Sequence, residues 1–180
     1  MSIIQQGNNV LVILSLAEML SASNVGVIRR YESWKNKNKS KHGLSIEDSG
    51  CGIQVEGALG ELAVAKAINR YWDMSVNTFK QADIGNNIQV RTRLRHSYDL
   101  IIRDDDNPNH VFVLVTGIGP EYIIRGWCYG HEGMKKEYLA NHGGYYEAYF
   151  VPQDKLRPFK PKERDHVTDQ PSSADENPKG

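Results

Sequence analysis

The chain has 180 residues, of which 39% are hydrophobic and 24% charged, a composition that suits one domain with a substantial core. Its formal net charge is zero, so any nucleic-acid binding must come from local patches and not from a global positive field. Two cysteines without CxxC spacing argue against a disulfide scaffold and a structural zinc site. The apolar run 10–14 lacks a basic flank and is too short to span a bilayer, so we expect a cytoplasmic protein.

The N-terminal part of the chain is predicted to be helical. Residues 1–9 are polar and are expected to be a loose start, and residues 10–34 supply apolar side chains for a buried helical stripe. A basic stretch over 29–42 follows, with Tyr31 and Trp34 interleaved. Its lysines include Lys35, Lys37 and Lys39. Such a stretch can track phosphates and stack bases, or it can be a solvated linker, which is the more common role of a charge run.

A second helix is predicted over residues 57–70, and it carries one acid on its apolar face. At 100° per residue, three apolar residues fall within about 60° of Glu61. They are Val64, Ala65 and Ile68. Because burial of an unpaired carboxylate costs several kcal/mol, we expect Glu61 to be neutral, paired or bound to a metal ion.

Most of the remaining chain is rich in strand signals. The second helix is expected to end near Trp72, and strands are predicted over 76–81, 88–94, 98–103, 110–116, 121–127 and 145–151. Gly85, Asn86 and Asn87 have the chemistry of a hairpin turn. A helix is expected over 131–139, and residues 160–180 are expected to be a disordered tail. This order predicts a single α+β or three-layer α/β domain over residues 1–159.

Four residues around the hairpin form a candidate metal site. Magnesium needs hard oxygen ligands, and the carboxylates of Glu61 and Asp83 can meet the amide carbonyl of Gln89 at one point. Arg91 shares the strand face of Gln89 and supplies a cation that can hold a phosphate. Motifs for a serine or cysteine nucleophile are absent from the sequence, so water is the expected nucleophile.

At these positions the chain resembles the PD-(D/E)XK nuclease superfamily. That family carries an acid on its first core helix, an Asp at a strand start and an acid-x-Lys on the next strand. The matching residues are Glu61, Asp83, Gln89 and Arg91, and the resemblance covers about residues 53–152, with a downstream pattern similar to small phage and bacterial proteins. It implies a restriction-endonuclease-like fold with a central mixed sheet flanked by helices, here preceded by an N-terminal helix. It also implies hydrolysis of phosphodiester bonds in DNA with Mg²⁺ or Mn²⁺.

The chain departs from the family pattern at three positions. Ala82 replaces a proline, which is a tolerable variation. Gln89 replaces a carboxylate and supplies a carbonyl without negative charge, and Arg91 replaces a lysine and cannot act as a general base. Two carboxylates in place of three should weaken metal binding. The alternative is therefore a nuclease-fold module that binds nucleic acid or a protein partner without cleavage.

Each candidate also has a plain structural interpretation. Glu61 can form a buried ion pair with Arg91 or Arg93 that joins helix to sheet, and Asp83 before Gly-Asn-Asn is ordinary turn chemistry. A local basic cluster comprises Arg91, Arg93, Arg95, His96 and Arg103. This cluster either positions a DNA backbone or neutralises acids such as those at 104–106. The sequence is compatible with a homodimer and carries no motif for an organic cofactor.

Overall fold

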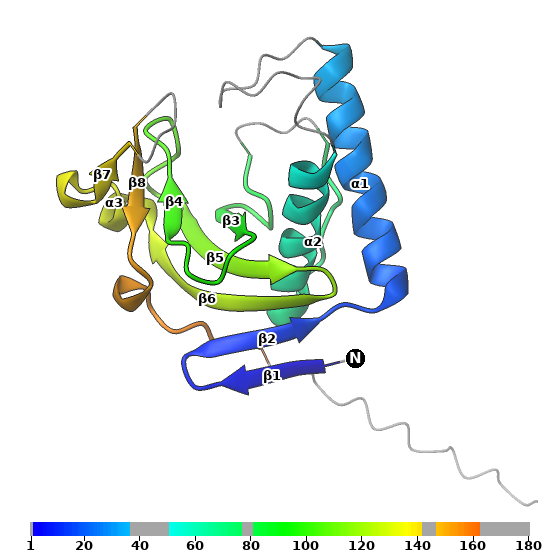
Figure 1. Ribbon diagram of the computed structural model, residues 1–180, viewed down its shortest axis with the longest axis horizontal. Coiled ribbons are helices and arrows are strands. Elements are labelled where there is room, and N and C mark those ends of the chain that lie inside the picture. Colours follow the sequence, from blue (N-terminus) through cyan, green and yellow to red (C-terminus); the bar gives the residue numbers. More distant parts are fainter. Residues whose placement is uncertain (1, 37–50, 77–80, 142–146, 163–180) are drawn as a thin grey trace, which may run out of the picture.

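The computed structural model describes residues 2–36, 51–76, 81–141 and 147–162. Several predicted features lie wholly or mostly outside these residues. They are Lys37, Lys39, the predicted strand 76–81 and the predicted tail 160–180. The predicted strand 145–151 lies partly outside. The described chain forms a mixed α/β structure around a central mixed sheet (Figure 1), as the sequence predicted.

The central sheet has five strands in the order β1-β2-β6-β5-β3. They are β1 (Ser2–Gln6), β2 (Asn9–Ile13), β3 (Ile88–Arg93), β5 (Val111–Ile118) and β6 (Glu121–Tyr129). Strands β3 and β5 run parallel, and every other neighbouring pair in this sheet is antiparallel. β3, which carries two of the candidate site residues, is therefore an edge strand.

Two long helices cover one face of this sheet (Figure 1). Helix α1 (Leu16–Lys35) begins with a capping box, in which Ser15 and Glu18 exchange backbone and side-chain hydrogen bonds. Helix α2 (Gly52–Ala67) lies between α1 and the sheet and buries most of its C-terminal half. The larger hydrophobic core lies between these helices and the sheet. In the part of the chain that is described, no helix is long and apolar enough to cross a membrane.

The opposite face of the sheet is covered by a second, smaller sheet where helices were predicted. Its strands β4 (Leu100–Ile102), β8 (Ala148–Val151) and β7 (Leu139–Ala140) run in the order β4-β8-β7. A second core forms here from Phe112, Leu114 and Val151, together with residues of β4. The side chains of β5 alternate between the two cores, which is why this strand is almost entirely buried.

The first residues form a hairpin, so the prediction of a loose start and a helix from residue 10 is wrong at this end. β1 and β2 are joined by the two-residue loop 7–8, where Gly7 has a φ of +60°. β2 then pairs with β6, and Val10 and Val12 become fully buried. The backbone hydrogen bonds offered by β6 decide the outcome, because a short apolar run suits either a strand or a helix.

Three other boundaries differ from the prediction. α2 ends at Ala67, because Asn69 adopts a left-handed φ of 50°, and Trp72 returns to the core. The helix predicted over 131–139 is replaced by α3 (Gly130–Gly133), the 3-10 turn η1 (Lys136–Tyr138) and β7, which pairs with β8. The described chain also stays attached beyond residue 160, since the backbone N–H of Lys162 donates to the carbonyl of Ala67 at 2.9 Å.

Two glycines bring the helices close enough to form a site. A Cβ at Gly26 would lie 2.5 Å from the Cα of Val55, so α1 packs backbone to backbone on α2. A Cβ at Gly60 would lie 2.0 Å from Oγ1 of Thr92, so α2 rests directly on β3. Arg29 lies one turn after Gly26, and Glu61 follows Gly60. These contacts bring a side chain of α1 and a side chain of α2 to the same edge of the sheet.

Candidate functional site

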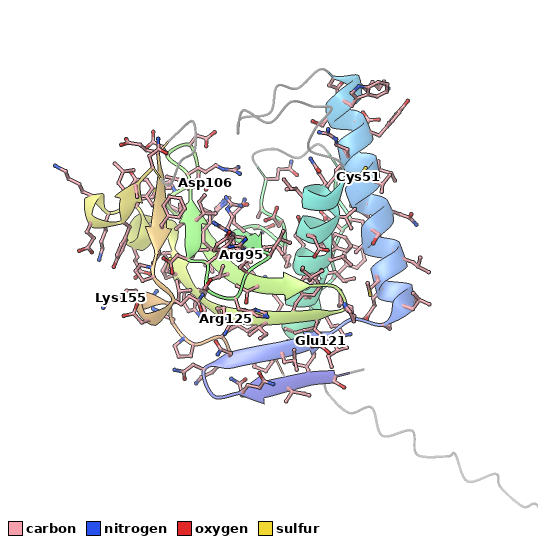
Figure 2. The ribbon with its side chains drawn as sticks, in the orientation of Figure 1. Cys51, Arg95, Asp106, Glu121, Arg125 and Lys155 are labelled. Atoms are coloured by element: carbon pink, nitrogen blue, oxygen red, sulfur yellow. The ribbon has the colours of Figure 1, made fainter. Side chains whose placement is uncertain are left out.

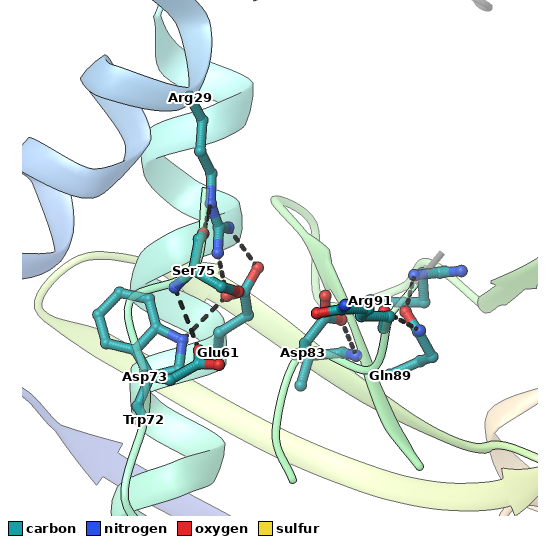
Figure 3. A network of polar contacts seen from close by, with 10 residues as sticks. Arg29, Glu61, Trp72, Asp73, Ser75, Asp83, Gln89 and Arg91 are labelled. Atoms are coloured by element: carbon teal, nitrogen blue, oxygen red, sulfur yellow. Dashed lines mark hydrogen bonds and ion pairs between the residues drawn. The ribbon is translucent and has the colours of Figure 1, made fainter. Parts of the chain in front are cut away.

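Glu61 is buried, with 6% of its surface exposed, and its charge is paired. Its Oε1 accepts a hydrogen bond from Nη1 of Arg29 at 2.6 Å, and its Oε2 accepts one from Nη2 of Arg29 at 2.8 Å (Figure 3). The indole Nε1 of Trp72 donates a third hydrogen bond to Oε2 at 3.0 Å. The sequence correctly predicted a buried acid that needs a partner.

The partner is Arg29 of α1 and not Arg91 or Arg93, so both predicted ion pairs are wrong. Arg29 is fixed a second time, because its Nε donates to the carbonyl of Ser75 at 2.9 Å. Burial lowers the pKa of Arg29, but the hydrogen bonds and charge of Glu61 outweigh this effect and raise it overall. Arg29 begins the basic stretch 29–42, yet it points inward because it shares a helix face with Val25 and Gly26.

Asp83 lies at the base of the predicted hairpin. Ile84 pairs with Ile88 across the turn, and Gly85 has a φ of +61°, which confirms the turn predicted at 85–87. The Oδ2 of Asp83 accepts a hydrogen bond from the backbone N–H of Val90 at 2.7 Å. Burial, and then the negative charge of Glu61, raise the pKa of Asp83 to about 7 against the opposing effects of Val90, Arg91 and Arg29.

Gln89 and Arg91 share one face of β3 and are hydrogen-bonded to each other. Nη1 of Arg91 donates to Oε1 of Gln89 at 3.3 Å, and Nη2 of Arg91 donates to Oδ2 of Asp106 at 2.7 Å. The Nε2 of Gln89 donates to the carbonyl of Gln81 at 2.9 Å. The Nε of Arg91 is buried and has no hydrogen-bond partner among the described residues. One donor of this guanidinium is therefore left over.

Together these residues form a charge row of Arg29, Glu61, Asp83 and Arg91, in which two carboxylates lie between two guanidinium groups (Figure 3). The outer pairs are attractive. The inner pair is repulsive, and this repulsion adds to the larger effect of burial in raising the pKa of Asp83. The centre of the row consequently favours a proton or a bound cation.

The remaining predicted DNA contacts lie on or beside β3 and at the end of α1. The guanidinium groups of Arg93 and Arg95 lie 4.6 and 5.7 Å from the ring centre of Tyr98. Arg95 and Asp106 are marked in Figure 2, and Asp106 is the acid that engages Arg91. Arg91 thus pairs with one acid of the 104–106 turn, a contact that agrees with the structural alternative. Lys35 is the last residue of α1 and is exposed.

The donors available to a metal ion are two carboxylates and one amide carbonyl. Within the described ranges, no group of three or more His, Cys, Asp or Glu residues could hold a metal. Glu61, Asp83 and Gln89 nevertheless offer hard oxygens, which suit Mg²⁺ or Mn²⁺. Because burial is the main cause of the raised pKa of Asp83, a bound cation would stabilise its carboxylate. The donor set fits such an ion chemically once Arg29 releases at least one oxygen of Glu61.

Sequence reasoning missed Arg29 and Trp72. Arg29 could have been found from its helical spacing, since it follows the buried Val25 by four residues and Gly26 by three. Trp72 carried no signal beyond its size. Comparison of the chain with protein-family models, with curated proteins and with solved structures finds no significant match.

Proposed function

We propose that this protein is a metal-dependent nuclease of the restriction-endonuclease-like fold that hydrolyses phosphodiester bonds in DNA. The observation that carries the proposal is the repulsive pair at the centre of the charge row. Glu61 lies on helix α2 and Asp83 lies at the base of the hairpin, and burial and the charge of Glu61 raise the pKa of Asp83 to about 7. Two acids whose charges repel each other in a site of low exposure are typical of a site that binds a cation.

In this proposal Glu61 and Asp83 hold Mg²⁺ or Mn²⁺, and Gln89 contributes its amide oxygen. The ion would supply Lewis acidity toward the phosphate and activate water as the nucleophile. Arg91 contacts the scissile phosphate, because a guanidinium can donate two parallel hydrogen bonds to phosphate oxygens. Arg93 and Arg95 contact the flanking DNA backbone, while Lys35 extends the basic surface from the end of α1.

The test is cleavage of supercoiled plasmid and linear DNA by the purified protein in Mg²⁺ or Mn²⁺. The Asp83→Ala variant should lose cleavage, because it loses one of two carboxylate ligands. Asp154→Ala is a matched control, since Asp154 is an exposed acid on the turn η2 (Gln153–Lys155). Equal cleavage by wild type and Asp83→Ala would refute the site assignment.

A second candidate is a nuclease-fold module that binds nucleic acid without cleaving it. It is favoured by the pairing of both outer guanidinium groups, because Arg29 occupies both oxygens of Glu61 and Arg91 engages Asp106. Under this candidate, wild type and Asp83→Ala would bind DNA equally and neither would cut it. The same experiment, with a binding assay added, separates the two functions.

A further inference from the structure

We propose that Arg29 competes with the metal ion for Glu61, so that the site binds metal only when the guanidinium of Arg29 releases the carboxylate of Glu61. The inference rests on the proposed function, because it concerns how that same site is regulated. It assigns a role to α1, which lies outside the part of the chain that resembles nucleases.

The geometry of the pair makes the two cations compete for the carboxylate of Glu61. Arg29 places one N–H on each oxygen of Glu61, at 2.6 and 2.8 Å. An ion shared by Glu61 and Asp83 needs an oxygen of Glu61 at about 2.1 Å, and the ion would repel a guanidinium left on the same carboxylate. We therefore expect Arg29 to release at least Oε1 when a metal ion binds.

The surroundings allow this release without loss of the carboxylate's position. Trp72 donates to Oε2, so Glu61 stays oriented when Oε1 is freed. Arg29 keeps an independent anchor, because its Nε is bonded to the carbonyl of Ser75. The side chain of Arg29 is also 20% exposed, whereas that of Glu61 is 8% exposed, so the guanidinium has access to solvent or to a DNA phosphate.

Under this competition, the apparent affinity for metal equals the intrinsic affinity multiplied by the fraction of molecules in which Glu61 is free. The decisive measurement is calorimetric titration of Mn²⁺ without DNA into wild type, Arg29→Gln, Arg29→Lys and Asp83→Asn. Arg29→Gln should bind Mn²⁺ about tenfold more tightly than wild type, the shift expected on removal of a competitor worth about 1.4 kcal/mol. Arg29→Lys should be intermediate, because lysine keeps the charge but cannot form the fork. Asp83→Asn should bind more weakly than wild type.

A purely structural ion pair predicts the opposite order, with metal binding unchanged or weakened by loss of Arg29. Equal affinity of wild type and Arg29→Gln, with weaker binding by Asp83→Asn, would overturn the competition and leave the metal-dependent function intact. Absence of Mn²⁺ binding by all four proteins would overturn both. Melting curves in EDTA establish that each variant is folded.

A second readout works in the presence of native Arg29, should Arg29→Gln fail to fold. In a Trp34→Phe/Trp127→Phe background, Trp72 is the sole tryptophan, because the chain has three. Because Trp72 donates to the carboxylate of Glu61, exchange of Arg29 for a divalent ion on that carboxylate should shift Trp72 emission in step with Mn²⁺ binding. Calorimetric binding with no change in Trp72 emission would place the ion away from Glu61 and overturn the proposal.

Discussion

Gly60 of α2 and Thr92 of β3 pack so closely that no side chain fits between them. A Cβ at position 60 would lie 2.0 Å from Oγ1 and 3.0 Å from Cβ of Thr92. The contact sets the distance between the helix and the edge strand. Because Glu61 is the next residue, the contact also sets where its carboxylate meets the residues of β3.

Gly60→Ala should therefore destabilise the protein by about 1–3 kcal/mol, the usual effect of overpacking a tight contact. Urea denaturation measures the free energy of unfolding. Gly57→Ala in the same helix is the matched control, because nothing lies within 4 Å of its Cβ position. It should stabilise the helix by about 1 kcal/mol.

The clash of an alanine at position 60 can also be relieved by a smaller side chain at position 92. Oγ1 of Thr92 is buried and has no hydrogen-bond partner in the described part of the chain, so Thr92→Ala removes no hydrogen bond there. The double variant Gly60→Ala/Thr92→Ala should recover most of the stability lost in Gly60→Ala. Additive losses in the double variant would show that the two residues do not set the spacing together.

Asp83→Asn should make the stability of the protein less dependent on pH. The pKa of Asp83 is raised to about 7 by burial and by Glu61, so the folded state holds this proton more tightly than the unfolded state. The contribution of Asp83 to the stability of the folded state is therefore fully present below about pH 4, and it is lost as the pH rises through about 7. Asparagine stays neutral and still accepts from the N–H of Val90.

We expect Asp83→Asn to be more stable than wild type by about 2 kcal/mol at pH 8, and close to wild type at pH 4. Urea denaturation in metal-free buffer at the two pH values measures this difference. Asp154→Asn serves as the control, because this acid is exposed on η2. A stabilisation by Asp83→Asn that is equal at both pH values would contradict the raised pKa.

The sequence predicted those features that depend on local periodicity. The alternation of 88–94 predicted β3, and the helical position of Glu61 among apolar residues predicted its burial. The run 10–14 was ambiguous, because five apolar residues suit a strand or a helix until a partner such as β6 is known. The partner of Glu61 was not predictable from the second helix or the strands, because it depends on where α1 crosses α2 at Gly26.

The two cysteines should react at very different rates with a thiol reagent such as DTNB. Cys51 is exposed at the start of α2, whereas Cys128 is buried in the core beneath the small sheet. Burial, with a smaller effect of Glu132, raises the pKa of the Cys128 thiol to about 11, so little thiolate forms at neutral pH. One thiol should react quickly in the native protein, and the second only on unfolding.

Cys51→Ser makes this assignment specific, since the remaining thiol should then report global unfolding alone. The labelling rate of Cys51→Ser in increasing urea should follow the unfolding transition measured by circular dichroism. Rapid labelling of Cys51→Ser without denaturant would show that the layer formed by β4 and β8 opens in the native state.

If the basic residues next to the charge row contact DNA, their removal should reduce the salt dependence of binding. Each phosphate contact contributes about 0.9 to the slope of log K against log salt. Arg95→Ala should therefore make the slope less negative by about 1, without loss of stability, because Arg95 is exposed. Arg93→Gln should act in the same direction. Fluorescence anisotropy of a labelled duplex between about 50 and 200 mM salt measures both slopes.

Lys155→Ala is the matched control for this charge change, because Lys155 is an exposed cation on η2, next to Asp154 (Figure 2). It lowers the net charge by the same amount as Arg95→Ala but should leave the slope unchanged. A slope reduced equally by Lys155→Ala and Arg95→Ala would indicate a response to total charge. A slope reduced only by Arg95→Ala and Arg93→Gln would place the DNA backbone along β3, beside Asp83 and Arg91.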